Sequence, residues 1–151
     1  MPKVITPKAF GAPLGMYSHG MVAAGGELVV VAGQVGTTPE GRVPGNDIVS
    51  QTRQAFENVR TVLQAGGAGM GDVIRLQTFL TRAEDIPGFM KARQDLFPEY
   101  FPTGAYPPNT LLVVSRLVRP DLLVEIEAMA MRRPTRAKTP TRRKPTKRRR
   151  R

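Results

Sequence analysis

An amphipathic helical pattern over residues 47–67 constrains this chain more than any other feature of its sequence. Asn46 or Asp47 offers a side-chain oxygen that can cap the start of a helix, and Gly66-Gly67 suits the left-handed turn that follows a helix end. Between them, the mainly apolar side of the predicted helix is formed by residues that recur at steps of three and four: Ile48, Thr52, Ala55, Phe56, Val59, Val62 and Leu63. The sequence therefore predicts a helix of about five turns that must bury one side.

A second helix of the same kind is predicted from Ile86 to Phe97. Glu84 and Asp85 precede it, where negative charge is favourable to a helix N-terminus. Pro98 is expected to end the helix, because proline lacks the backbone N–H and crowds the preceding turn. Two helices that are each apolar on one stripe are expected to cover one face of a single sheet.

Strand patterns fill the stretches around the two helices. Residues 72–81 alternate in side-chain character, and residues 28–32, 111–114 and 122–131 are apolar runs of β type. Residues 1–13 are expected to be irregular, and residues 14–21 are expected to form a hairpin with 28–32 around Gly25-Gly26. The order β-β-α-β-α-β-β predicts an α/β (α+β) fold with a mixed sheet and two helices on one face.

The final strand has two different faces. One face is apolar, whereas the other alternates glutamate with methionine: Glu125, Glu127, Met129 and Met131. A row of this kind suits a face that is covered by another copy of the chain, so we expect a homo-oligomer with clefts between subunits. The alternative is an ordinary half-exposed sheet face that carries surface glutamates.

The net charge of +11 is concentrated at one end of the 151-residue chain. Residues 1–131 hold eleven basic and twelve acidic residues, a net charge of −1, whereas residues 132–151 hold twelve basic residues and no acid. We expect one domain over 1–131 and a disordered basic tail over 132–151. The tail side chains expected to contact nucleic acid or another polyanion are Arg142, Arg143, Lys144, Lys147, Arg148, Arg149, Arg150 and Arg151. The alternative is a solvated tail, because no aromatic residue is interleaved to stack on bases.

Several classes of chemistry lack the residues they need. The chain has no cysteine and a single histidine, His19, so a disulfide framework, a thiolate nucleophile and a cysteine metal ligand are excluded. The usual pair of acid–base histidines for RNA cleavage is not supplied either, so a ribonuclease ranks low among the candidate functions. Neither a signal peptide nor an apolar run of membrane-spanning length is present, so a soluble cytoplasmic protein is expected.

Residues 106–116, YPPNTLLVVSR, begin a strand in an unusually rigid way. Pro107 and Pro108 fix their own φ angles and disfavour helix at the residues before them. Asn109 and Thr110 then supply the only side-chain hydrogen-bonding groups ahead of the apolar run. A stiff, polar start of this kind can hold a side chain in a fixed direction for a ligand.

Seven segments together resemble the RidA/YjgF family of enamine/imine deaminases over about residues 4–133. They are Gly15–His19, Val31–Gln34, Gln51–Val59, Phe79–Thr81, Pro107–Thr110, Ser115–Leu117 and Val124–Ala128. The resemblance implies a chorismate-mutase-like α/β fold, assembled as a homotrimer with a pocket at each subunit interface. It also implies a reaction that needs neither a metal nor an organic cofactor.

The resemblance also assigns site residues. In the family's deaminases, an arginine at the position of Asn109 grips the carboxylate of a 2-imino or 2-enamino acid. A glutamate at the position of Glu125 places the water that attacks the C=N carbon, and Tyr17 and the backbone near Gly33 line the pocket. We therefore expect Glu125 to be catalytic, and Tyr17, Gly33, Asn109 and Thr110 to bind the substrate.

The departure at Asn109 weakens one part of this expectation. An arginine offers a charged bidentate fork to a carboxylate, whereas an asparagine offers one neutral NH₂ group and a carbonyl oxygen that repels the anion. The loss costs about 1.5–3 kcal/mol in binding. Activity on the usual 2-imino acids is therefore expected to be weak or absent.

Three functions remain open from the sequence. The first is a hydrolase that acts on a small imine or enamine; the second is a non-catalytic trimer that binds a small molecule; the third is a protein that associates with nucleic acid through its tail. For Asn109 the alternative to ligand binding is a structural asparagine that bonds its own turn. For Glu125 it is a hydrogen-bond network at an interface.

Overall fold

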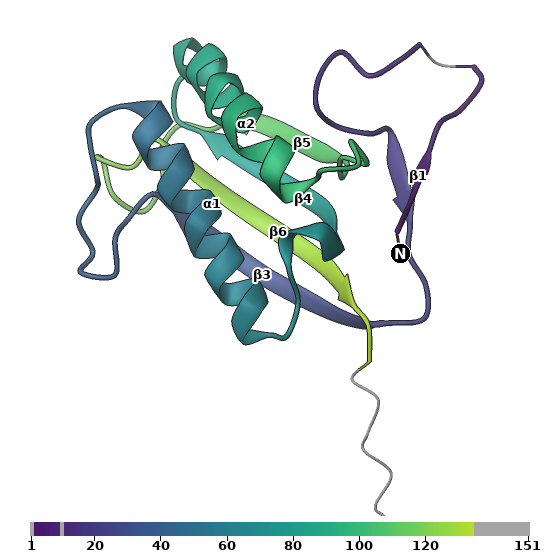
Figure 1. Ribbon diagram of the computed structural model, residues 1–151. Helices are drawn as coiled ribbons and strands as arrows, with labels where there is room; N and C mark the ends of the chain where they lie inside the picture. Colours follow the sequence, from purple (N-terminus) through teal and green to yellow (C-terminus); the bar gives the residue numbers. More distant parts are fainter. Residues whose placement is uncertain (1, 10, 135–151) are drawn as a thin grey trace, which may run out of the picture.

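Two long helices lie side by side on one face of a four-stranded sheet in the computed structural model, which describes residues 2–9 and 11–134 (Figure 1). The elements in chain order are β1 (Lys3–Ile5), β2 (Gly20–Val22), β3 (Glu27–Val35), α1 (Ile48–Ala65), β4 (Val73–Leu80), α2 (Ile86–Tyr100), β5 (Asn109–Val113) and β6 (Val124–Arg132). Single 3₁₀ turns at Met70–Asp72 and Ala83–Asp85 precede β4 and α2. The mixed sheet with both helices on one face confirms the predicted fold class.

The sheet has the strand order β3-β6-β4-β5. β6 pairs antiparallel with both β3 and β4, whereas β4 and β5 run parallel and are joined by α2 as a crossover. β1 and β2 form a separate antiparallel pair beyond the edge of this sheet. β6 is therefore a central strand, and its residues face a neighbour on both sides.

The hairpin expected between residues 14–21 and 28–32 is wrong. Residues 14–19 form bends, where the Tyr17 amide donates to the Gly15 carbonyl at 2.9 Å, so only Gly20–Val22 is extended. That short strand pairs with Lys3–Ile5, a stretch expected to be irregular. A Gly-Gly pair allows a sharp change of chain direction, either between two strands of one sheet or between two sheets. Here Gly25, with φ +73°, lies where the chain passes from β2 to β3 of the four-stranded sheet.

The helix boundaries follow the predicted signals at three of four ends. The Asp47 carboxylate accepts from the Ser50 amide at 2.8 Å and caps α1. Gly66 caps its C-terminus. Pro98, however, lies inside α2 and does not end it, because the helix continues to Tyr100. A proline this close to a helix end removes only one intrahelical bond, and the buried rings of Tyr100 and Phe101 hold the last turn on the core.

The core lies between the helices and the sheet. Phe56 of α1 and Phe89 and Phe97 of α2 are completely buried, and Phe56 meets Phe97 edge to face with 5.5 Å between ring centroids. They pack on the apolar face of β6 and β4, where Ile126 and Leu80 are equally buried. The phenylalanines of the second helix are therefore core residues.

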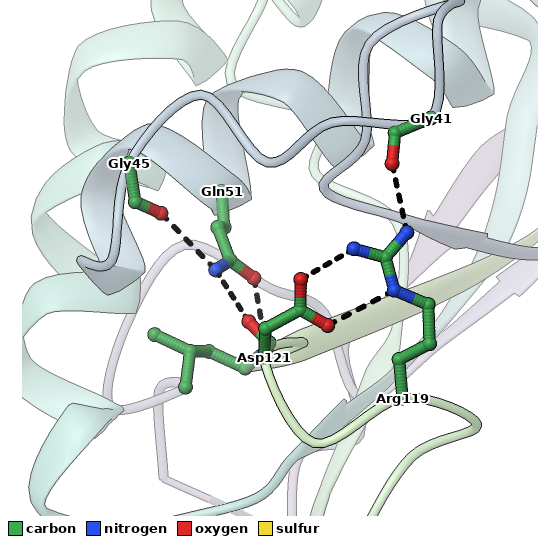
Figure 2. A network of polar contacts seen from close by, with 6 residues as sticks. Gly41, Gly45, Gln51, Arg119 and Asp121 are labelled. Carbon is green, nitrogen blue, oxygen red and sulfur yellow. Dashed lines mark hydrogen bonds and ion pairs between the residues drawn. The ribbon is translucent and has the colours of Figure 1, made fainter.

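A polar clamp holds the loop before α1 and the turn before β6 together (Figure 2). The Gln51 side chain is completely buried, although the helical pattern placed it outside the apolar stripe. Its amide nitrogen donates to the Gly45 carbonyl at 3.2 Å and the Asp121 carbonyl at 2.9 Å, and its oxygen accepts from the Leu123 amide at 2.9 Å. These three bonds satisfy buried backbone groups and fix the start of β6 relative to α1.

An exposed ion pair lies beside this clamp. The Arg119 guanidinium donates to the Asp121 carboxylate and also to the Gly41 carbonyl, the latter at 2.7 Å (Figure 2). The hydrogen bonds from Arg119 lower the pKa of the Asp121 carboxyl below its usual range. The turn at residues 119–121 is thereby tied to the loop at 36–47.

The other face of the sheet is not covered by any helix of the described residues (Figure 1). Leu28 and Val30 of β3 are 56% and 61% exposed there, and Leu112 of β5 is 43% exposed. A shallow hollow of about 130 Å³ lies on β3, β4 and β6, and its lining residues are Val30, Val31, Ala32, Arg75, Gln77, Glu127, Ala128 and Met129. This face, called the open face below, carries the apolar and acidic row that the sequence predicted.

Candidate functional site

The Glu125 carboxylate lies directly over the backbone of Gly33. Glu125 is half-buried on β6, and its register partners are Val35 on β3 and Phe79 on β4. A β-carbon on Gly33 would overlap Oε1 of Glu125. The β3–β6 register shifts between Val31 and Gln34, which is the bulge in which Gly33 lies. The bulge and the missing side chain together make the space that the carboxylate occupies on the open face.

Replacing Gly33 with alanine is expected to displace the Glu125 carboxylate. The added methyl group meets Oε1, so the side chain must rotate away or β3 must shift. We expect at least a tenfold loss of the Glu125-dependent activity proposed below, measured as the initial rate. Gly71→Ala is the matched control, because a β-carbon there meets no atom within 4 Å. An unchanged rate in Gly33→Ala would show that the position of the carboxylate does not matter.

The Asn109 side chain is bonded to the neighbouring strand. Its Oδ1 accepts from the Thr78 hydroxyl at 3.0 Å, and Thr78 is 1% exposed on the helix-covered face of β4. Asn109 is therefore half-buried at the first position of β5, with its side chain toward that face. Among the described residues its Nδ2 group has no hydrogen-bond partner, so both of its N–H donors are left for another group.

Thr110 lies on the open face. It is exposed, and its register partner on β4 is Gln77. Phe79, two residues further along β4, is the register partner of Glu125. Two strand spacings and two residues separate Thr110 from Glu125, a distance of about 12 Å between their Cα atoms. Thr110 and Glu125 therefore share a face within one chain without touching each other.

Tyr17 lies away from both strands, in the loop that connects β1 and β2. Its ring meets that of His19 edge to face with 6.4 Å between centroids, and the His19 ring contacts the Gly11 carbonyl at 2.9 Å. Tyr17 lines two cavities, of about 250 and 190 Å³. Gly33, Asn109 and Glu125 line neither of them.

One chain therefore brings together Glu125 and Gly33 but not the whole predicted set. Asn109 and Glu125 lie on opposite faces of the sheet, two strands and three residues apart, which is about 14 Å between their Cα atoms. That distance exceeds the reach of one small ligand between the two side chains. A site that used both would have to draw them from different copies of the chain.

A charged residue that is not among the predicted site residues lies beside Tyr17. Arg93 of α2 is 2% exposed and lines the 250 Å³ cavity together with Tyr17. Its guanidinium donates to the Met16 carbonyl, and its Cζ lies 4.5 Å from the centroid of the Phe97 ring. Burial lowers the pKa of Arg93 to about 10. Its position on the core side of α2, three residues after Met90 and four before Phe97, is the pattern from which its burial could have been inferred.

The described residues, 2–9 and 11–134, contain no group of three His, Asp or Glu side chains that could bind a metal ion. None of their helices combines the length and the apolar character that a membrane span requires. β6 continues through Arg132, one residue into the expected tail. The tail side chains from Arg142 to Arg151 lie outside the described residues.

Comparison with known proteins finds similarity over nearly the whole described region. Residues 7–132 match the sequence model of the family described as Endoribonuclease L-PSP. A RutC family protein of Pyrococcus horikoshii is 36% identical over 131 residues, which are 86% of this chain and 98% of that protein. The 2-iminobutanoate/2-iminopropanoate deaminase of Salmonella typhimurium is 30% identical over 133 residues, 88% of this chain and 100% of that enzyme.

The structural comparison agrees with the sequence comparison. The crystal structure of a Rid family protein of unknown function from Yersinia pestis has a TM-score of 0.76 to this chain at 30% identity. The similarity covers 86% of this chain and 98% of that one. The four-stranded sheet with two helices on one face is thus shared with this set of proteins.

Proposed function

The chain belongs to the RidA/YjgF family, and on that premise we propose that it hydrolyses a small imine or enamine to a carbonyl compound and ammonia. The reaction takes place in a homotrimer, in a pocket at each boundary between copies. Glu125 is its catalytic residue. Tyr17, Gly33, Asn109 and Thr110 form the surroundings of the substrate.

The observation that carries this proposal is the position of the Glu125 carboxylate over the Gly33 backbone. The absent side chain of Gly33 lets the carboxylate lie against the backbone of β3 on the face of the sheet that no helix of the described residues covers, and there it can meet a water and a C=N group between copies of the chain. Its register neighbour Phe79 is half-buried and supplies an apolar wall. Gly33 lies where the ladder to β6 is interrupted, so its strand offers the ligand backbone groups that regular pairing would use.

The chemistry needs one proton acceptor and one later proton donor. Water adds to the C=N carbon while the Glu125 carboxylate takes one of its protons and passes it to the nitrogen, which gives a tetrahedral carbon bearing OH and NH₂ groups. Glu125 then takes the hydroxyl proton as C=O forms and delivers it to the departing nitrogen, so the C–N bond breaks and NH₃ leaves. The sum is C=NH plus H₂O giving C=O plus NH₃, with the glutamate regenerated.

A trimer supports this arrangement in two ways. It covers the open face, whose Leu28 and Val30 are more than half exposed in the single chain. It also offers the route by which Tyr17 and Asn109 of one copy can meet Glu125 of another. The mass of the protein in solution checks the assembly, and three chains are expected.

The neutral Asn109 limits which imines react well. The arginine that the family resemblance leads one to expect at this position is absent, and Oδ1 of Asn109 already accepts a hydrogen bond from Thr78. A carboxylate attached directly to the reacting carbon therefore finds one neutral NH₂ group where the family's deaminases offer an arginine. Hydrolysis of the usual 2-imino acids is proposed to be slow.

The experiment follows ammonia and keto-acid release from freshly generated 2-iminopropanoate and from imines of larger carbonyl compounds. We expect acceleration over the buffer rate for at least one imine, and a rate with 2-iminopropanoate at least tenfold below that of the Salmonella typhimurium deaminase. A rate equal to that enzyme would contradict the role given to Asn109. Ligand binding without turnover of any imine would favour the second function, a non-catalytic binding trimer.

A further inference from the structure

We infer that the 250 Å³ cavity lined by Tyr17 and Arg93 is a subsite for a small carboxylate, and that the buried guanidinium of Arg93 binds this carboxylate. This inference rests on the proposed function, because it names the part of the substrate that Arg93 holds. The substrate class it assigns is an imine or enamine whose carboxylate is separated from the reacting carbon. Asn109 and Glu125 take no part in this subsite, since neither lines the cavity.

The cavity has the size and lining of a site for a short carboxylate with an apolar chain. Its volume is about 250 Å³, which is below the range of pockets for drug-sized ligands and suits a molecule of a few heavy atoms. Its lining residues are Leu14, Gly15, Met16, Tyr17, Met90, Arg93 and Gln94. One charge, one amide and one phenol are thus set among apolar walls. A ligand with one anionic end and a short alkyl chain matches that lining.

Arg93 is a buried cation that lacks an anionic partner. Among the described residues no carboxylate lies within ion-pair distance of it. Of the five N–H groups of an arginine, one donates to the Met16 carbonyl and one to the Met90 sulfur at 3.6 Å. The buried Nε–H has no partner at all. Buried charges are ordinarily paired, because removing an ion from water is expensive.

A purely structural role accounts for part of this geometry only. The Met16 bond ties the loop before β2 to α2, and Phe97 and Phe89 lie under the guanidinium with 4.5 and 5.6 Å from Cζ to their ring centroids. A methionine would fill the same space over two aromatic rings without the desolvation penalty. An anion in the cavity would supply the missing charge partner, and the planar fork of Arg93 matches a carboxylate.

Binding at Arg93 would place the substrate carboxylate away from Asn109. Asn109 begins β5, whereas Arg93 lies in the middle of α2, so a carboxylate held by Arg93 is not where an arginine at position 109 would hold it. Arg93 lies on the helix-covered side of the sheet and Glu125 on the open face, so a substrate that met both would do so between two copies of the chain. A 2-imino acid has its carboxylate on the reacting carbon itself, whereas an imine such as that of 4-oxopentanoate carries its carboxylate two methylene groups away from the C=N carbon.

The test uses the full-length protein and butyrate as the probe, with butylammonium and inorganic phosphate as comparisons. Titration is followed by calorimetry and by the Arg93 Nε–H signal in ¹⁵N NMR spectra, assigned from its absence in Arg93→Lys. We expect butyrate to bind and to shift that signal, phosphate to bind more weakly for want of an alkyl chain, and butylammonium not to bind. Arg93→Met is expected to lower the affinity for butyrate roughly ten- to a hundred-fold.

Arg53→Met is the matched control, because Arg53 is an exposed arginine of α1 that pairs with Asp95 of α2 at its surface. It should leave butyrate binding unchanged. Should Arg93→Met fail to fold, the NMR shift in the unaltered protein and the affinity of Arg93→Lys, expected to be intermediate, still decide the question. Butyrate binding that is equal in Arg93→Met and the unaltered protein, or an Arg93 signal that does not move, would overturn the subsite.

The outcome for Glu125 separates this inference from the proposed function. Glu125→Gln should bind butyrate as the unaltered protein does. If Glu125→Gln also hydrolyses imines at the unaltered rate, the catalytic assignment fails while the Arg93 subsite stands. If turnover depends on Glu125 but butyrate binding does not depend on Arg93, the subsite fails and the hydrolase remains.

Discussion

Replacing Glu125 with glutamine is expected to slow imine hydrolysis by a factor of about 10² to 10⁴. Glutamine has the same shape, so it can still occupy the space over Gly33 that the absent β-carbon leaves. It cannot take a proton from the attacking water or return it to the nitrogen. The loss should therefore fall on kcat with the best substrate, while the affinity for that substrate changes little.

The matched control for this substitution lies two residues along the same strand. Glu127 is on the same face of β6 as Glu125, but it is exposed, and its register partner is Gln77. Glu127→Gln removes the same charge from the open face without touching the proposed water position, so kcat should stay within a factor of about two. Equal losses in the two variants would point to a general effect of face charge on assembly, which the solution mass of each variant would reveal.

The periodic segments of the chain could be predicted from sequence because local signals and burial agree there. Asp47 and Gly66 mark the ends of α1 by capping chemistry that does not depend on the rest of the fold. The two faces of β6 follow from strict alternation, and Val124 and Ile126 are completely buried as expected. Family resemblance then identified the fold as a whole, and the shared architecture confirms it.

The deviations arise where tertiary contacts override a local pattern. The alternation over residues 72–81 would put Val73 on the same face as Arg75, but a register shift between them turns Val73, 2% exposed, into the core. Gln51 has the polarity of a surface residue, but the loop before α1 and the turn before β6 both pack against it and bond its side chain. Neither event has a signal within the stretch of sequence that it changes.

The candidate site is less predictable than the fold for a similar reason. The pairing of Glu125 with Gly33 requires the bulge in β3, and the pattern of residues 28–35 does not show where that bulge falls. Arginine is a residue type usually found at the surface, so residue type alone predicts an exposed Arg93, whereas the structure buries it. Asn109 could be singled out only by resemblance, and its bond to Thr78 follows from the parallel pairing of β4 with β5.

Replacing Asn109 with arginine is expected to raise kcat/KM for 2-iminopropanoate roughly ten- to a hundred-fold. The arginine supplies the charged, bidentate donor that the carboxylate of this substrate lacks in the present protein. It also removes the acceptor of the Thr78 hydroxyl, which is buried, at a cost of about 1–3 kcal/mol in folding stability. The gain in rate should therefore come with a lower Tm.

Asn109→Leu separates these two effects. Leucine removes the same bond from Thr78 and adds no charge, so it should lower the Tm by a similar amount without any gain in rate. The gain in Asn109→Arg should also vanish when Glu125 is replaced with glutamine in the same chain, because the arginine positions the substrate and the glutamate carries the proton. These two comparisons distinguish substrate positioning from a loosened fold.

The most direct test of the account is the initial rate of pyruvate release from freshly generated 2-iminopropanoate, compared between the unaltered protein and Asn109→Arg. We propose that this chain retains the glutamate and glycine of an imine hydrolase and lacks the arginine that would bind the substrate carboxylate at position 109. We therefore expect a slow rate in the unaltered protein and a rate at least tenfold higher in Asn109→Arg. A rate in Asn109→Arg that is no higher than that of the unaltered protein would contradict it.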